Sequence, residues 1–180
     1  FDHSVIIPIV ISWPGRIVAG QKRKEIVNLI DLAASLISAG GAPSLPHSKG
    51  SSFLDLLKGK PNKWQNLTLS EFYGGLVSIE ATAIANRMVR NERFKLNYYH
   101  GFPLELFDMI EDPDETHNLS NDLNYKETAN HLLSIIQDGW NSNRILRYID
   151  RNAVDVDLLK QWTKTTNVSE KYRWFPETAK

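Results

Sequence analysis

Apolar and polar positions alternate most clearly between Met88 and Leu119. Short runs rich in aromatic and branched residues there are typical of half-buried strands. Turn-forming residues interrupt the runs at positions 91–93 and 101–103, where hairpins would turn. Asp112 and Pro113 end the pattern, because proline lacks the backbone donor that a continuing strand needs. The stretch therefore predicts two or three short strands followed by an acidic turn.

A different apolar pattern opens the chain. Residues 5–13 form a nearly continuous β-branched run, which is typical of a strand buried on both faces of an α/β sheet. Pro8 interrupts this run, so we expect regular strand pairing to begin after it.

Helical spacing covers several other segments. Apolar residues three and four apart predict an amphipathic helix over residues 24–39, ended by Gly40 and Gly41. A short helix is expected within residues 50–59, capped by Ser51 or Ser52. One more strand is expected at residues 67–73. The remaining helices are predicted over the ranges 125–139, 140–149 and 154–162.

Composition narrows the function classes. The 180 residues carry 21 basic and 21 acidic side chains without a basic stripe, so the electrostatic signature of nucleic-acid binding is missing. There is no cysteine, which excludes disulfides and thiolate metal sites and leaves the compartment undecided. The longest apolar run is far too short to span a membrane. Because the chain opens on Phe1, we expect it to be the rear part of a longer protein.

Four sequence motifs follow one another between residues 88 and 119: M-V-R, K-L, E-L-F-D and D-P-x-E-x-x-N-L. Their matching residues are Met88, Arg90, Lys95, Glu105, Leu106, Phe107, Asp108, Asp112, Pro113, Glu115, Asn118 and Leu119. In order and spacing they resemble the C-terminal subdomain of sulfatases of the alkaline-phosphatase superfamily, in the style of choline-sulfatases and arylsulfatases. Blocks at residues 4–15 and 50–59 resemble the same family, although Ile6 stands where relatives carry Arg or His.

The resemblance implies a fold of class α/β, with α+β character in its C-terminal part. We expect the last strand or strands of an alkaline-phosphatase-like sheet, then a small antiparallel sheet packed on a helix, then a helical tail. The expected boundaries are residues 1–62 for the end of the α/β core, 63–140 for the small subdomain and 141–180 for the tail.

The resemblance also implies hydrolysis of a sulfate ester by a formylglycine and a divalent metal, usually calcium. This chain has no cysteine and no Asp-Asp pair, and its S-x-P-x-R sequence, Ser12 to Arg16, belongs to the block that resembles the family's "rwPG" turn. Both groups are therefore expected in an N-terminal catalytic part outside the chain. The chain alone should be inactive and should supply scaffold and pocket rim. Its partners would then be a small-molecule or glycan sulfate ester and that catalytic part. An exposed apolar edge at residues 6–11 and aggregation of the isolated chain are expected.

Two histidines are the candidate substrate-binding residues. His3 lies nearest to the missing site, since loops at strand ends line pockets in α/β sheets. His100 lies in a loop between strands, where a turn histidine beside glycine is the simpler interpretation. Asp2 could cap or pair locally instead of touching substrate.

An acidic cluster at residues 108–117 invites interpretation as a metal site. Its spacing is not that of an EF-hand, because Pro113 stands inside and the required glycine is missing. Turn chemistry explains Asp112 and Asn118 more simply, since both residue types bond neighbouring backbone. We therefore expect no metal ligands in this chain.

Other interpretations remain open. A phosphonate or phosphate monoester hydrolase of the same superfamily shares the C-terminal pattern. A non-catalytic binding module would instead start at its own Met and fold alone. The tail aromatics Tyr172, Trp174 and Phe175 indicate a contact surface for a homo-oligomer. Three N-x-S/T triplets, at Asn66, Asn118 and Asn167, are interpreted as unused.

Overall fold

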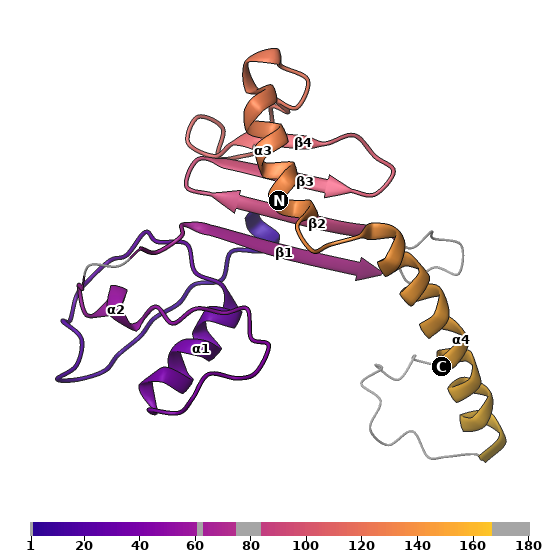
Figure 1. The fold of residues 1–180 in the computed structure, drawn as a ribbon, viewed down its shortest axis with the longest axis horizontal. Helices are drawn as coiled ribbons and strands as arrows, with labels where there is room; N and C mark the ends of the chain where they lie inside the picture. The colour runs from indigo at the N-terminus through magenta and orange to yellow at the C-terminus, as the bar shows by residue number, and fades with distance from the viewer. Residues whose placement is uncertain (1, 61–62, 75–83, 167–180) are drawn as a thin grey trace, which may run out of the picture.

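A four-stranded antiparallel sheet with strand order β1-β2-β3-β4 forms the centre of the molecule (Figure 1). The computed structural model describes residues 2–60, 63–74 and 84–166. The strands are β1 (Leu67–Gly74), β2 (Ile84–Asn91), β3 (Phe94–Tyr99) and β4 (Glu105–Asp108). They confirm the strands predicted between residues 88 and 119 and at 67–73.

The turn between β2 and β3 falls on the predicted break at residues 91–93. The Asn91 side-chain oxygen accepts the backbone N–H of Arg93 at 2.9 Å and that of Phe94 at 2.7 Å, which closes the turn locally. Between β3 and β4, Gly101 has φ +83°, a conformation that glycine adopts without steric cost. The local sequence therefore explains both hairpins, the first through the Asn91 side chain and the second through the backbone freedom of Gly101.

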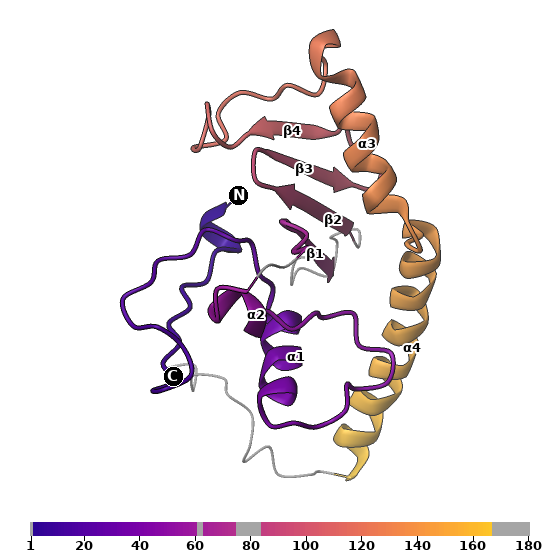
Figure 2. The ribbon, with the colours of Figure 1, turned by 60° about the vertical axis from the view of Figure 1, so that its left-hand side comes forward.

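Helix α3 (Lys126–Gln137) covers one face of this sheet (Figures 1 and 2). Strand register aligns Leu69, Val89, Leu96 and Leu106 in one row across the four strands. The buried core that joins this face to α3 consists of Val89, Leu96, Leu106, Ala129, Leu132 and Ile136. Alternation along the strands and helical spacing in α3 bring these side chains together, as the sequence pattern predicted.

Helix α1 (Leu29–Ala39) begins five residues later than predicted. Asn28 and Asp31 form a capping box that sets this start, and Gly40 ends the helix as expected. Residues 24–28 instead bond to neighbouring segments: Ile26 donates its N–H to Asn66 and accepts from the Trp64 indole. The predicted start was wrong because tertiary hydrogen bonds outweigh helical spacing there.

Helix α2 (Leu54–Leu57) is the predicted short helix. Its N-cap residue, Phe53, makes no side-chain cap, but the Ser52 hydroxyl accepts the N–H of Leu54, the first residue of the helix, at 3.4 Å, so Ser52 bonds the helix start as expected. The N–H of Ser51 is bound by the Asp31 carboxylate at 2.8 Å, and the N–H of Phe53 by the Ser35 hydroxyl at 2.9 Å. The approach to α2 is thus held by α1.

The N-terminal run differs most from expectation. A single 3-10 turn, η1 (Asp2–Ser4), precedes residues 6–13, which belong to no helix or strand. No strand pairs with this run in the part of the chain that the structure describes, and an unpaired segment cannot be a sheet strand. The strand expected over residues 5–13 was therefore wrong. The apolar side chains of this run are exposed, up to 96% at Val10, which confirms the apolar exposure expected at residues 6–11.

Helix α4 (Ser142–Thr166) is one continuous helix of 25 residues where two helical segments were predicted. Its first turns contact β1 and β2, and both views show it running on past the sheet (Figures 1 and 2). Apolar side chains on the projecting part, including Leu158 and Trp162, are exposed. The tail aromatics Tyr172, Trp174 and Phe175 lie outside the described residues.

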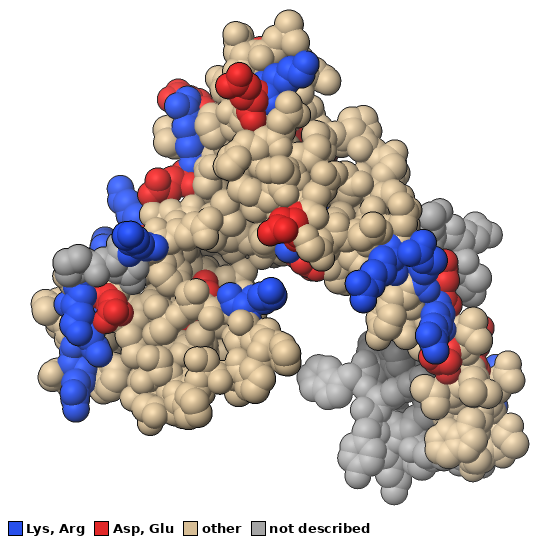
Figure 3. All heavy atoms as spheres, in the orientation of Figure 1, with Lys and Arg blue, Asp and Glu red and all other residues tan. Residues whose placement is uncertain are grey.

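Charged side chains of both signs lie next to one another on the face drawn in Figure 3. Among the residues that the structure describes, no helix is both long and apolar enough to cross a membrane.

Candidate functional site

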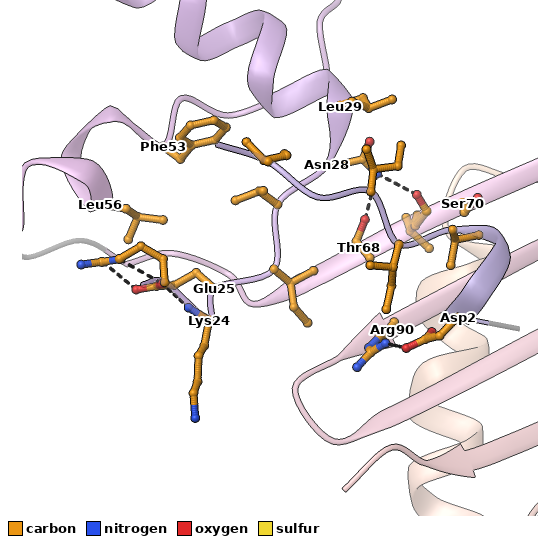
Figure 4. Close-up of a pocket in the computed structure, with 18 of the residues that line it drawn as sticks. Asp2, Lys24, Glu25, Asn28, Leu29, Phe53, Leu56, Thr68, Ser70 and Arg90 are labelled. Atoms are coloured by element: carbon orange, nitrogen blue, oxygen red, sulfur yellow. Dashed lines mark hydrogen bonds and ion pairs between the residues drawn. The ribbon is translucent and has the colours of Figure 1, made fainter. Parts of the chain in front are cut away.

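A cleft of about 1090 Å³ lies between the N-terminal run, residues 21–29, α2 and β1 (Figure 4). Apolar side chains line much of it, among them Ile6, Phe53 and Leu56. The exposed apolar run and the cleft are thus one continuous surface. A continuous exposed apolar surface marks a contact site for another molecule or another part of the same protein.

Asn28 fixes one wall of the cleft. Its amide nitrogen donates to the Thr68 hydroxyl at 2.8 Å and to the Leu69 carbonyl at 3.0 Å, both on β1 (Figure 4). The same side chain caps α1, so a single residue ties that helix to the sheet.

The far end of the cleft is charged, where Asp2 and Arg90 line it together (Figure 4). Their ion pair belongs to a cluster that also contains Lys95 and Glu115. The Lys95 ammonium lies 2.8 and 2.9 Å from the two Glu115 oxygens and 3.2 Å from an Asp2 oxygen. Lys95 is 1% exposed, Glu115 7% and Asp2 8%, so one cation and two anions are buried together, and the half-buried Arg90 joins them from the cleft.

Strand register explains why the two cations of this cluster are neighbours. Arg90 on β2 is directly paired with Lys95 on β3, so both side chains leave the sheet on the face opposite α3. Burial lowers the pKa of Arg90, whereas the Glu115 carboxylate acts to raise it. Two like charges side by side would repel, and the two carboxylates remove that repulsion.

The two candidate histidines lie on different elements. His3 lies within η1, beside the buried Asp2, and its side chain is outside what the structure describes. His100 follows β3 in a turn, donates its N–H to the Ala85 carbonyl at 3.0 Å and does not line the cleft. Its Nδ1 lies 3.3 Å from the Tyr98 hydroxyl. Substrate contact by either histidine stays a prediction.

Asp108 and Asp112 bind neighbouring backbone N–H groups, and Asp108 also binds a cation. The Asp108 carboxylate accepts hydrogen bonds from the Arg93 guanidinium at 2.8 Å and from the backbone N–H of Ile110 at 3.1 Å. Burial acts to raise the pKa of Asp108, but Arg93 and the neighbouring amides outweigh it, so the pKa is lowered. Hydrogen bonds from the amides of Thr116 and His117 lower the pKa of Asp112.

Asn118 completes this set of turn-forming side chains. Its oxygen accepts the N–H of Leu106 at 3.0 Å and that of Ser120 at 2.9 Å, while its nitrogen donates to the Leu104 carbonyl at 3.2 Å. The acidic motif is therefore a structural turn fastened to the edge of β4. Within the described ranges, no group of three or more His, Asp or Glu side chains lies together as a metal site.

The sequence interpretation missed the buried cluster, although Arg90, Lys95 and Glu115 were all among the matching motif residues. Asp2 forms ion pairs, but its partners Arg90 and Lys95 are about ninety residues away, whereas the sequence interpretation had suggested a local partner. One signal was available: Lys95 stands in the middle of a strand whose neighbours are apolar or aromatic, where a lysine needs a partner.

Comparisons with known proteins show which proteins this chain is similar to. A family model described as "N-sulphoglucosamine sulphohydrolase, C-terminal" matches residues 1–141. Arylsulfatase K of Gallus gallus is 28% identical over 150 residues, covering 76% of this chain and 26% of that protein. The chain spans about a quarter to a third of the length of the first curated relatives it matches.

Two solved structures share the fold. One, described as a 2-O GAG sulfatase, is 28% identical with a TM-score of 0.53 and covers 71% of this chain and 25% of that one. The other is a phosphonate monoester hydrolase of Agrobacterium radiobacter, 25% identical with a TM-score of 0.54, covering 64% and 26%.

Proposed function

Because the chain belongs to the sulfatase family, through the C-terminal domain matched over residues 1–141, we propose that it is the C-terminal part of a sulfuric ester hydrolase. The observation that carries the proposal is that the residues between 88 and 119 that resemble the family motifs make defined structural contacts. Asp108, Asp112 and Asn118 build the turn after β4, and the buried cluster joins that turn to the N-terminal run.

The proposed contribution of this chain is scaffold and pocket rim. Formylglycine and calcium, implied by the resemblance, do not fit the residues present: the chain has no cysteine and no Asp-Asp pair, and its S-x-P-x-R sequence, Ser12 to Arg16, places Ser12 exposed in the irregular N-terminal run, in the block that resembles the family's "rwPG" turn. Its motif carboxylates are engaged by backbone N–H groups and cations. We assign both groups to a catalytic part that precedes Phe1, and by itself the chain is inactive.

That catalytic part is the proposed occupant of the apolar cleft. Exposed Ile6, Val10 and Ile11 offer a β-branched edge to which a sheet of the preceding part could add a strand. This pairing would supply the neighbour whose absence leaves residues 6–13 outside any strand. The isolated chain should then expose the edge and aggregate.

The proposed substrate is a sulfate ester, on a small molecule or a glycan. A glycan is favoured by the 2-O GAG sulfatase, whose identity to this chain is 28%. We further propose that the projecting part of α4, with exposed Leu158 and Trp162, contributes to a homo-oligomer contact.

One rival function has a specific observation behind it. The phosphonate monoester hydrolase matches with the same fold at 25% identity, so the C-terminal subdomain alone does not separate the two chemistries. The family model over residues 1–141 favours the sulfatase. A stand-alone binding module has no comparable support.

The reading frame upstream of Phe1 tests this proposal. We expect it to stay open and to encode C/S-x-P-x-R. A stop codon directly upstream, with a functional initiator at the start of this chain, would overturn the sulfatase proposal and favour a binding module.

A further inference from the structure

The buried cluster binds the backbone of the N-terminal turn as well as side chains. Glu115 Oε1 accepts the N–H of Asp2 at 2.5 Å. The carbonyl of Asp2 in turn accepts the N–H groups of Val5 at 3.0 Å and Ile6 at 2.9 Å. A continuous line of hydrogen bonds therefore runs from the turn after β4 through η1 to the segment that lines the cleft.

Glu115 has a backbone geometry suited to this contact. Its φ is +56°, in the left-handed region that few residues other than glycine adopt. This conformation turns the carboxylate inward, where Lys95 binds both of its oxygens. With one oxygen also held by Asp2, the carboxylate has little freedom to rotate.

Stability alone does not account for such a cluster. Removing Asp2, Lys95 and Glu115 from water is costly, and apolar side chains of similar volume often stabilise a protein at least as well. Ion pairs and hydrogen bonds have directional geometry, so they hold the groups that they join in one defined arrangement. Here they join residue 2 to residues 90, 95 and 115, which lie on β2, on β3 and in the turn after β4.

We infer that Lys95 and Glu115 are positioning residues that fix the polypeptide at Asp2, and with it the direction in which the chain enters the cleft. Residue 3, the candidate substrate contact, lies in the same turn, so a change at Lys95 or Glu115 moves the rim of the pocket without touching substrate. The anchoring of Asp2 stands on the geometry alone. Its consequence for catalysis rests on the proposed function.

Hydrogen exchange at the amides of Asp2, Val5 and Ile6 tests the anchor in the protein as its reading frame encodes it. The variant combines Lys95→Met with Glu115→Asn. It removes one charge of each sign and keeps the ion pair between Asp2 and Arg90. Asparagine is chosen at position 115 because it tolerates the left-handed φ of that position. We expect exchange at the three amides to rise by about tenfold or more while β2 and β3 keep their protection.

Two further variants make the outcome decisive. Glu115→Gln keeps an oxygen that can accept the Asp2 N–H, so protection should return to within about threefold of the unchanged protein. Arg93→Met removes an ion pair of the same sheet that does not touch Asp2, and should leave the three amides unchanged. Unchanged exchange in the double variant, or an equal loss in Arg93→Met, would overturn the anchor.

A second readout separates the anchor from the proposed function. If the protein hydrolyses sulfate esters, the double variant should lower kcat/KM by about tenfold or more and Arg93→Met should not. Released amides with unchanged kcat/KM would keep the anchor and refute its role at the pocket. Absence of any sulfatase activity in the unchanged protein would refute the proposed function and leave the exchange result standing.

Discussion

Lys95→Met alone is the most informative single perturbation of this fold. Lys95 is 1% exposed, and its ammonium has three carboxylate oxygens within 3.2 Å. The substitution leaves Glu115 and Asp2, 7% and 8% exposed, with Arg90 as the remaining cation of the cluster. Removing one partner of a buried ion pair costs roughly 3–5 kcal/mol, because the other charge stays buried without compensation.

For a folding unit of this size within the complete protein, that loss corresponds to a fall in Tm of about 10 °C. Urea unfolding followed by circular dichroism measures the change in the free energy of unfolding. Adding Glu115→Asn should recover most of the loss, to within about 1.5 kcal/mol of the unchanged protein, because the unpaired carboxylate is then gone. A cost below about 1 kcal/mol for Lys95→Met, or additive costs in the double variant, would refute the reasoning.

Three smaller predictions follow from the same contacts. Leu132→Ala in the centre of the core should lower the free energy of unfolding by about 2–5 kcal/mol in urea melts, and an effect under about 1 kcal/mol would contradict the packing. The folded-state pKa of Asp108 is lowered, so its stabilisation is present above the unfolded pKa of about 3.9 and is lost as pH falls through the folded value. Between pH 6 and pH 3, the Asp108→Asn variant should therefore lose less stability than the unchanged protein. Parallel stability curves would contradict the lowered pKa of Asp108. Leu158→Asp on α4 should shift the mass measured by light scattering toward the monomer, whereas Lys160→Asp, on the charged side of the same helix, should not. An unchanged mass in Leu158→Asp would remove α4 from the oligomer contact.

Local chemistry made the small sheet and α3 predictable. Asn91 closes the first hairpin with its own side chain, and Gly101 suits the conformation of the second. Apolar residues two apart on the strands and three or four apart on α3 identified the core face. These signals lie within a few residues of the structure they specify.

Contacts between distant segments were not predictable in the same way. Residues 24–28 stay outside α1 where Ile26 bonds Asn66 and Trp64, about forty positions away. Residues 6–13 read as a strand, but a strand exists only with a neighbour, and none is found among the described residues. The anchoring of Asp2 by Glu115 spans 113 positions, so no local pattern could indicate it.

Direct assay of ester hydrolysis tests the central claim, that this chain is the C-terminal part of a sulfatase and lines its pocket. The protein encoded by the complete reading frame and the 180-residue chain alone should be given the same sulfate, phosphate and phosphonate esters. The account predicts turnover by the complete protein, with the highest kcat/KM for a sulfate ester, and none by the 180 residues alone. Turnover by the isolated chain, or a complete protein that hydrolyses phosphonate esters and no sulfate ester, would contradict it.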